Sequence, residues 1–348
     1  MSYYLDHAAL DTLLGALHKE YRIFAPKRFP LEGRFSDTDI IRYAEYGKEL
    51  SCWSEVELTE RSTYAAKEVV NPLNQSIFYF TPEAYHESKE CTKPILVFLR
   101  PCDIHSFSHQ DKIYLENGGF VDSFYARVRQ QLRFVLIECL TGFDTCFCVS
   151  FGCNQSDDYV MAVRQQPQGV SFFVKDESLK GYFTANSPCD FTPQFIQANQ
   201  VQVVLPQIPD KETLNALKKH PFWEEYDRRC ISCGSCTVCC STCTCFTTRD
   251  IAYTQNAAMG ERRRMNSSCQ VKGFDEVAGG HSYRTSASAR YRYKMLHKYH
   301  DFQARFQETH MCVGCGRCTS HCPAYISQTA SIAKIKAAVE EITAQKGR

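Results

Sequence analysis

The sequence lacks the features of several large classes of protein. Its first residues show no basic segment followed by an apolar one, so a secretory signal peptide is not expected. The longest apolar run covers about five residues, at 95–99, whereas a membrane-spanning helix needs about 20. Lys and Arg (40) nearly balance Asp and Glu (39), and the net charge of +1 indicates no partner by itself. We therefore expect a cytoplasmic protein without a membrane segment.

Motifs for nucleotides and for hydrolysis are also missing. The chain contains neither the dinucleotide loop G-x-G-x-x-G nor the phosphate loop G-x-x-x-x-G-K-[ST], and its 11 histidines form no H-E-x-x-H pattern. Spacings that resemble a sirohaem ligand set can be drawn from Cys233 to Cys239 and from Cys318 to Cys322. Longer cysteine runs, described below, account for these residues better. The chain therefore shows no substrate site of its own.

Cysteine, in contrast, is abundant, with 20 among 348 residues and seven of them between Cys230 and Cys245. Proteins that depend on disulfide frameworks are usually small and secreted, and this chain is far longer. In a reducing cytoplasm, clustered cysteines indicate metal binding instead.

Hydrophobic periodicity divides the chain into two parts. Apolar residues at helical spacing predict a helix at 10–21 and another at 332–342, and a largely helical segment is expected at 103–131. Strands are predicted at 77–80, 95–99, 133–138, 159–163 and 170–174. The order strand, helix, strand favours a parallel pair of strands, because parallel strands need a long crossover.

We thus expect a mixed α/β domain at 1–220 and a cysteine-rich domain at 221–348. The second is predicted to be a mainly α-helical, ferredoxin-like dicluster domain. It carries a long insertion at 246–306.

Two cysteine runs in the second part follow the spacing C-x2-C-x2-C-x3-C, which is typical of bacterial ferredoxins with two 4Fe-4S clusters. In such runs the fourth cysteine binds the other cluster. The predicted ligands of cluster 1 are Cys230, Cys233, Cys236 and Cys322, and those of cluster 2 are Cys312, Cys315, Cys318 and Cys240. Glycines within the runs suit a tight loop that brings backbone N–H groups toward a cluster.

Structural zinc is the alternative for these runs. Zinc sites usually pair two C-x2-C knuckles and need no third consecutive step, so two complete runs favour iron–sulfur clusters. The first run has Ser241 where proline usually follows the fourth cysteine. Cys239, Cys243 and Cys245 offer further thiols, which we interpret as packing residues because buried free cysteine behaves as a small hydrophobic residue.

A third group of cysteines lies in the first part of the chain. Cys102 and Cys139 each follow a predicted strand, and Cys146 and Cys148 come soon after. If the two strands are parallel neighbours, their C-terminal ends share the sheet edge where α/β proteins bind ligands. The sequence thus suggests a third 4Fe-4S cluster, with buried core cysteines as the alternative. The remaining cysteines, interpreted as structural, are Cys52, Cys91, Cys153, Cys189 and Cys269.

The segment 261–306 is basic, with ten Lys or Arg against four Asp or Glu. Basic residues mixed with tyrosine can indicate RNA binding, but no known nucleic-acid module is present. We interpret the segment as a docking surface for a protein partner, with Arg262, Arg263 and Arg264 as its candidate contacts, or as a solvated face.

Several motifs in combination resemble a known family. They are RPCD at 100–103, CFCVSFG at 146–152, CISCGSC at 230–236, CTCF at 243–246, VAGGHSYR at 277–284, YRYKMLHKYH at 291–300 and CVGCGRCTSHCP at 312–323. Together they resemble the iron–sulfur electron-transfer subunit of anaerobic sulfite reductases. They also resemble the β subunit of cytoplasmic nickel–iron sulfhydrogenases. The resemblance covers about Pro94 to Pro323; Ser241 and the segment RRRMNSSC at 262–269 depart from it.

The resemblance implies a non-catalytic subunit of an NAD(P)H-dependent oxidoreductase. In such a complex a flavin and NAD(P)H-binding subunit delivers electrons, and a sirohaem subunit reduces sulfite to sulfide. The alternative is the relay subunit of a nickel–iron hydrogenase. A third possibility is a binding module whose clusters or zinc are structural. Neither nucleic acid nor membrane is expected as a partner.

Overall fold

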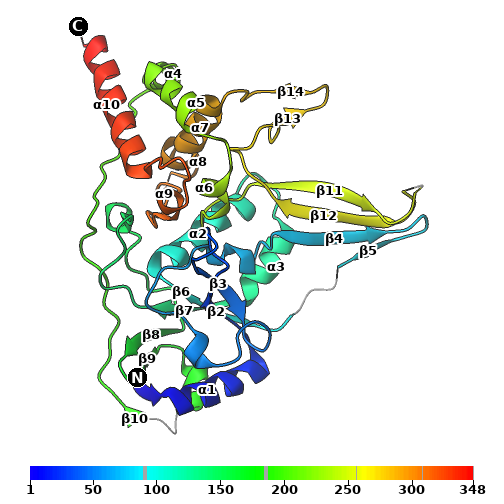
Figure 1. Cartoon of the computed structure of the whole chain (residues 1–348), viewed down its shortest axis with the longest axis vertical. Helices are drawn as coiled ribbons and strands as arrows, with labels where there is room; N and C mark the ends of the chain where they lie inside the picture. The colour runs from blue at the N-terminus through cyan, green and yellow to red at the C-terminus, as the bar shows by residue number, and fades with distance from the viewer. Residues whose placement is uncertain (89–91, 184–186, 256, 308, 348) are drawn as a thin grey trace. The chain divides into compact units, whose positions relative to one another are not determined.

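The computed structural model describes residues 1–88, 92–183, 187–255, 257–307 and 309–347 (Figure 1). The chain forms two compact units. The first contains Met1–Thr141, Asn154–Ile196 and Phe246–Asn266; the second contains Gly142–Cys153, Gln197–Cys245 and Ser267–Arg348. The chain therefore passes several times between the units, which differs from the single boundary expected near residue 220.

The first unit is built on an eight-stranded sheet of order β10-β1-β9-β8-β7-β6-β2-β3. Strands β2, β6, β7 and β8 are parallel to one another, and the outer pairs are antiparallel. The strands are β1 (Ser2–Asp6), β2 (Arg22–Phe29), β3 (Ile40–Glu45), β6 (Ile95–Leu99), β7 (Leu132–Ile137), β8 (Met161–Gln166), β9 (Gly169–Val174) and β10 (Ser187–Pro188). The predicted parallel pair is thus β6 and β7, and the mixed α/β class is confirmed.

Strand β6 shows why the short apolar run becomes the centre of this sheet. All five of its residues are buried, and they alternate between two cores. Leu96 and Phe98 pack in the core under helix α1 (His7–Glu20). Ile95, Val97 and Leu99 pack on the other face with α2 (Pro101–Tyr114) and α3 (Ser123–Gln131). A parallel strand covered on both faces reads as a continuous hydrophobic run.

A second sheet in the first unit has the order β11-β12-β4-β5 and is entirely antiparallel. Its strands are β4 (Asn74–Phe80), β5 (Tyr85–Glu87), β11 (Phe246–Ala252) and β12 (Gly260–Asn266). The first part of the expected insertion at 246–306 is therefore a hairpin that adds two strands to β4. Short 3-10 helices complete this unit at η1 (Trp53–Glu55), η2 (Ala66–Val69) and η4 (Glu177–Phe183).

The second unit is mainly helical, as the sequence predicts. Its helices are η3 (Cys148–Phe151), α4 (Lys211–Lys218), η5 (Pro221–Glu224), α5 (Glu225–Arg229), α6 (Ser235–Val238), α7 (Ala287–Leu296), the π-helix η6 (His297–Asp301), α8 (Phe302–Phe306), α9 (Arg317–Ser320) and α10 (Gln328–Lys346), with a small hairpin of β13 (Glu276–Val277) and β14 (His281–Ser282). One hydrophobic core joins α4, α5, α7 and α10. Within the part of the chain that the structure describes, no helix is both long and apolar enough to span a bilayer.

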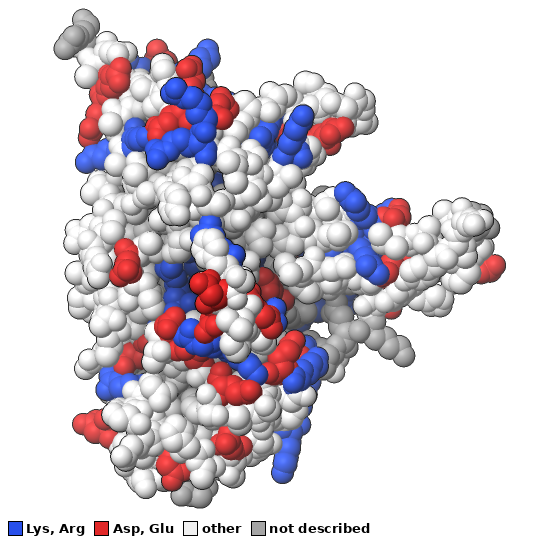
Figure 2. All heavy atoms as spheres, viewed as in Figure 1, with Lys and Arg blue, Asp and Glu red and all other residues white. Residues whose placement is uncertain are grey.

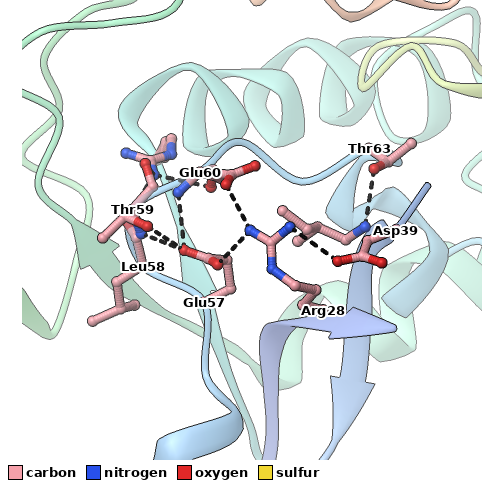
Figure 3. A network of polar contacts seen from close by, with 9 residues as sticks. Arg28, Asp39, Glu57, Leu58, Thr59, Glu60 and Thr63 are labelled. Carbon is pink, nitrogen blue, oxygen red and sulfur yellow. Dashed lines mark hydrogen bonds and ion pairs between the residues drawn. The ribbon is translucent and has the colours of Figure 1, made fainter. Parts of the chain in front are cut away.

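A polar network holds the loop 57–60, which lies next to the RPCD motif in the first unit (Figure 3). Arg28 forms ion pairs with Asp39, Glu57 and Glu60. Burial alone would raise the pKa of Glu57, but hydrogen bonds from Thr59, the Glu60 N–H and Arg28 lower it to about 2. The carboxylate is therefore a fixed charge that anchors this loop at neutral pH.

The anchored loop in turn fixes Arg100 of the RPCD motif. The Arg100 guanidinium donates to the carbonyl oxygens of Leu58, Thr59 and Glu60, the first at 2.7 Å, and to that of Glu138 at 3.3 Å. It therefore ties the loop, the end of β7 and the first turn of α2 together. The motif has a structural role that its sequence pattern did not reveal.

Candidate metal centres

The first cysteine run forms a tight loop followed by one helical turn. Cys230 ends α5, and Gly234, with φ of 80°, begins α6. The left-handed conformation at this position favours glycine. A side chain at Gly234 would also collide with Ser268, so the loop has no room for another residue here.

The second run repeats this geometry. Gly314 and Gly316 have φ of 67° and 75°, and Gly316 begins α9 as Gly234 begins α6. The loop packs against the segment 145–148, since Phe147 N donates to Gly314 O at 2.8 Å and Thr145 Oγ1 donates to Gly316 O at 3.2 Å. The expectation of glycine-dependent loops therefore holds in both runs.

Two cavities lie where the runs meet, and each is lined by cysteines from both runs. The first encloses about 420 Å³ including its opening, and its lining contains the predicted cluster 1 ligands Cys230, Cys233, Cys236 and Cys322. The second measures about 360 Å³, also including its opening, and its lining contains the predicted cluster 2 ligands Cys240, Cys312, Cys315 and Cys318. Each cavity is thus lined by the four cysteines that the crossed arrangement assigns to it, together with one cysteine assigned to the other cluster.

The two cavities share part of their lining. Cys236, Cys318, Lys294 and Gln328 line both. A group bound in the first cavity would therefore be separated from a group bound in the second by only a few side chains.

Hydrogen-bond donors surround the thiols of the second run. Gly314 N donates to Cys312 Sγ at 3.4 Å and Ile326 N donates to Cys322 Sγ at 3.3 Å. The Tyr299 hydroxyl also donates to Cys312. Ser241 Oγ lies 4.0 Å from Cys315 Sγ, so the serine that replaces proline places a hydroxyl beside a predicted ligand. Such bonds to sulfur tune the potentials of iron–sulfur clusters.

Burial opposes ionisation of several of these thiols. It raises the pKa of Cys312 to about 11, although Lys298, Tyr299 and the Gly314 N–H lower it. Burial likewise raises the pKa of Cys236 and of Cys318, again against a lowering effect of Lys294. Metal ligands must be thiolates, and positive charge near these cysteines, from a bound metal ion or from Lys294 and Lys298, favours that form.

Among the described residues, no three His, Cys, Asp or Glu side chains lie close enough to hold a single metal ion. A 4Fe-4S cluster has a different requirement, because its four thiolates are spread over the four irons of one larger group. Each cavity is lined by five cysteines, because Cys236 and Cys318 line both, so each has the four thiols that one cluster needs.

The additional thiols of the first run lie apart from the cavity linings. Cys239 has no exposed surface, and Cys243 is also buried. The thiol of Cys245 forms hydrogen bonds with those of Cys243 and Cys269. The bond from Cys245 lowers the pKa of Cys269 to about 7. Sequence spacing gave no sign of this contact, because Cys269 is distant in the chain.

The four cysteines of the suggested third cluster are divided between the units. Cys102 lies in the first turn of α2 and Cys139 follows β7, both in the first unit. Cys146 and Cys148 belong to the second unit and are buried. There Cys146 Sγ donates to the carbonyl of Cys315 at 3.7 Å. The sequence gave no signal that this segment packs on the second run.

The three arginines predicted as docking contacts each form an ion pair with a carboxylate of the first unit. Arg262 forms a two-point pair with Asp250 at 2.7 and 2.8 Å, and Arg263 pairs with Glu261. Arg264 is only 7% exposed, pairs with Asp122 and stacks on Phe246. Figure 2 shows basic and acidic side chains next to one another along the β11–β12 hairpin. The predicted role of Arg264 as a surface contact is therefore corrected: its partners lie within the first unit.

Other basic residues of the segment 261–306 belong to the second unit and are buried within it. Arg290, Lys294 and Lys298 are all at most 5% exposed. Arg290 is held by the carbonyls of Gln270, Arg284 and Thr285. Part of the positive charge of the segment 261–306 is therefore buried inside the protein and does not lie on its surface.

Comparison with known proteins agrees with this geometry. Residues 229–326 match the family described as 4Fe-4S dicluster domain. The chain is 29% identical to the sulfhydrogenase 2 subunit beta of Pyrococcus furiosus, over 70% of this chain and 74% of the relative. No solved structure matches the chain. The prediction of two 4Fe-4S clusters is confirmed, and the similarity supports the hydrogenase alternative better than the sulfite reductase one.

Proposed function

We propose that this chain is the iron–sulfur electron-transfer subunit of a multi-subunit oxidoreductase. The observation that carries the proposal is the pair of cysteine-lined cavities with shared lining residues. Adjacent clusters allow an electron to pass through the second unit in short steps. The eight thiols assigned to the cavities are proposed as the ligands.

The side chains around the cavities would hold and insulate the clusters. When bound, the clusters supply one-electron redox chemistry. Tyr299 and Val313 are buried beside the second run and exclude water there. Backbone N–H groups of Gly314 and Ile326 stabilise thiolate charge on the ligands. None of these residues needs to bind a substrate.

We propose a hydrogenase of the sulfhydrogenase type as the parent enzyme, because the similar protein is a sulfhydrogenase subunit. The partner would then be a nickel–iron catalytic subunit. The second candidate is an anaerobic sulfite reductase, in which a flavin and NAD(P)H-binding subunit supplies electrons to a sirohaem subunit. It is supported by the set of motifs between Pro94 and Pro323.

Isolation of the native complex separates these candidates. The chain should co-purify with a nickel-containing subunit in the first case and with a sirohaem subunit in the second, identified by metal analysis and absorption spectra. The isolated chain should be reduced by dithionite but should neither oxidise hydrogen or NAD(P)H nor reduce sulfite. Turnover of any of these substrates by the partner-free chain would contradict the relay proposal.

A third cluster bound by Cys102, Cys139, Cys146 and Cys148 stays a prediction. It is supported by the parallel pairing of β6 and β7, after which two of these cysteines follow. We expect the anaerobically reconstituted full-length chain to bind about twelve irons, and a Cys102→Ser/Cys139→Ser variant about eight. Iron analysis together with protein quantification measures this difference. About eight irons in both proteins would instead assign the four residues to packing.

A further inference from the structure

Two lysines occupy the interior of the second unit beside the cavities. Lys294 lies in the last turn of α7, and Lys298 follows in the π-helix η6. Their exposed fractions are 3% and 5%. Residues four apart lie on one face of a helix, and π-helical turns are frequent at functional sites.

The polar contacts of both ammonium groups within the protein are neutral. Lys294 Nζ donates to Gln328 Oε1 at 3.3 Å, and Lys298 Nζ donates to Thr242 Oγ1 at 2.9 Å. Within the described part of the chain, no carboxylate forms an ion pair with either lysine. A buried charge without an opposite charge is strongly unfavourable. The fold therefore needs another source of negative charge at this place.

The predicted cluster ligands supply that charge. Lys294 lines both cavities, next to Cys236 and Cys318, which also line both. Lys298 lines only the second cavity, together with Cys240 and Cys312. Thiolates in these positions would compensate both ammonium groups. Lys294 is close to the ligands of both clusters, whereas Lys298 is close to those of cluster 2.

We propose that Lys294 raises the reduction potentials of both clusters and that Lys298 raises mainly that of cluster 2. Reduction adds one electron to a cluster and increases its negative charge. A positive charge held nearby in a medium of low dielectric constant stabilises the reduced form more than the oxidised form. This inference rests on the proposed cluster ligands, but it does not depend on which enzyme the chain serves.

The test uses Lys294→Met and Lys298→Met in the full-length chain, because methionine keeps much of the side-chain length and removes the charge. Redox titration followed by EPR should show midpoints displaced to lower potential. The displacement should correspond to at least a tenfold change in the reduction equilibrium, or about 59 mV for one electron. Lys294→Met should move both signals and Lys298→Met mainly that of cluster 2, assigned with the cysteine variants described below. Lys336→Met, on α10, where the lysine side chain is 43% exposed, is the matched control and should move neither.

The outcomes separate a failed inference from a failed cluster assignment. Wild-type iron content and EPR signals test the assignment alone. With both clusters present, unchanged midpoints in the two variants would overturn the proposal. If Lys294→Met does not assemble clusters, Lys294→Arg, which keeps the positive charge, is measured instead. Assembly with midpoints close to those of the wild type supports the proposal. Loss of the clusters in both variants assigns Lys294 to packing and overturns the proposal.

Discussion

A Cys233→Ser variant of the full-length chain is expected to lose one of the two dicluster signals and to retain the other. Cys233 lines only the first cavity, and Cys315 lines only the second. A Cys315→Ser variant should therefore show the complementary loss. Each variant should bind about four irons fewer than the wild type, because each cluster contains four. EPR of the reduced proteins and iron analysis measure both effects.

The neighbouring cysteines Cys239 and Cys240 provide a matched pair of controls. Cys240 lines the second cavity, whereas the structure places the fully buried Cys239 outside the lining of both cavities. Cys240→Ser should remove the cluster 2 signal, and Cys239→Ser should retain both signals. Loss of iron in Cys239→Ser with full retention in Cys240→Ser would show that the fourth ligand of the first run was misassigned. Stoichiometric zinc in place of iron would contradict the cluster assignment altogether.

Local spacing made the cavities predictable. Three cysteines at steps of three residues can converge only if the intervening chain turns tightly, and glycine permits that turn. The loops at Gly234 and Gly316 show this conformation in both runs. Strand β6 was predictable for a similar local reason, because five consecutive apolar residues indicate a strand that is buried on both faces.

Features that depend on distant partners could not be read in this way. The sequence predicts Arg262 as a docking contact and does not reveal its ion pair, because Asp250 lies across a hairpin whose register the sequence does not state. The hairpin itself joins β4, which is far away in the chain. Lys294 and Lys298 looked like part of a solvated basic face, since nothing local reveals that thiols of both cysteine runs surround them.

The packing of segment 145–148 against the second cysteine run is likewise a contact between distant parts of the chain. It predicts a large effect of a substitution at Gly316 on stability and on cluster 2. Gly316 has a left-handed backbone, and a Cβ atom there would overlap the carbonyl group of Thr145. Gly152, also left-handed with φ of 66°, has no atom within 4 Å of such a Cβ. Alanine at either position lowers the free energy of unfolding by roughly 1–2 kcal/mol, because a residue with a Cβ atom disfavours the left-handed backbone. Only Gly316→Ala adds the overlap, so the pair separates the two effects.

We expect Gly152→Ala to lower the free energy of unfolding modestly and to keep both clusters. Gly316→Ala should lower it by about 1–3 kcal/mol more, because overpacking forces the backbone to move. The displaced segment is the loop between Cys315 and Cys318, so cluster 2 should be lost or become labile while cluster 1 persists. Denaturant unfolding under anaerobic conditions gives the first quantity, and EPR with iron analysis gives the second. Equal destabilisation by the two substitutions, with both clusters intact, would mean that the 145–148 segment does not pack against the second cysteine run in solution.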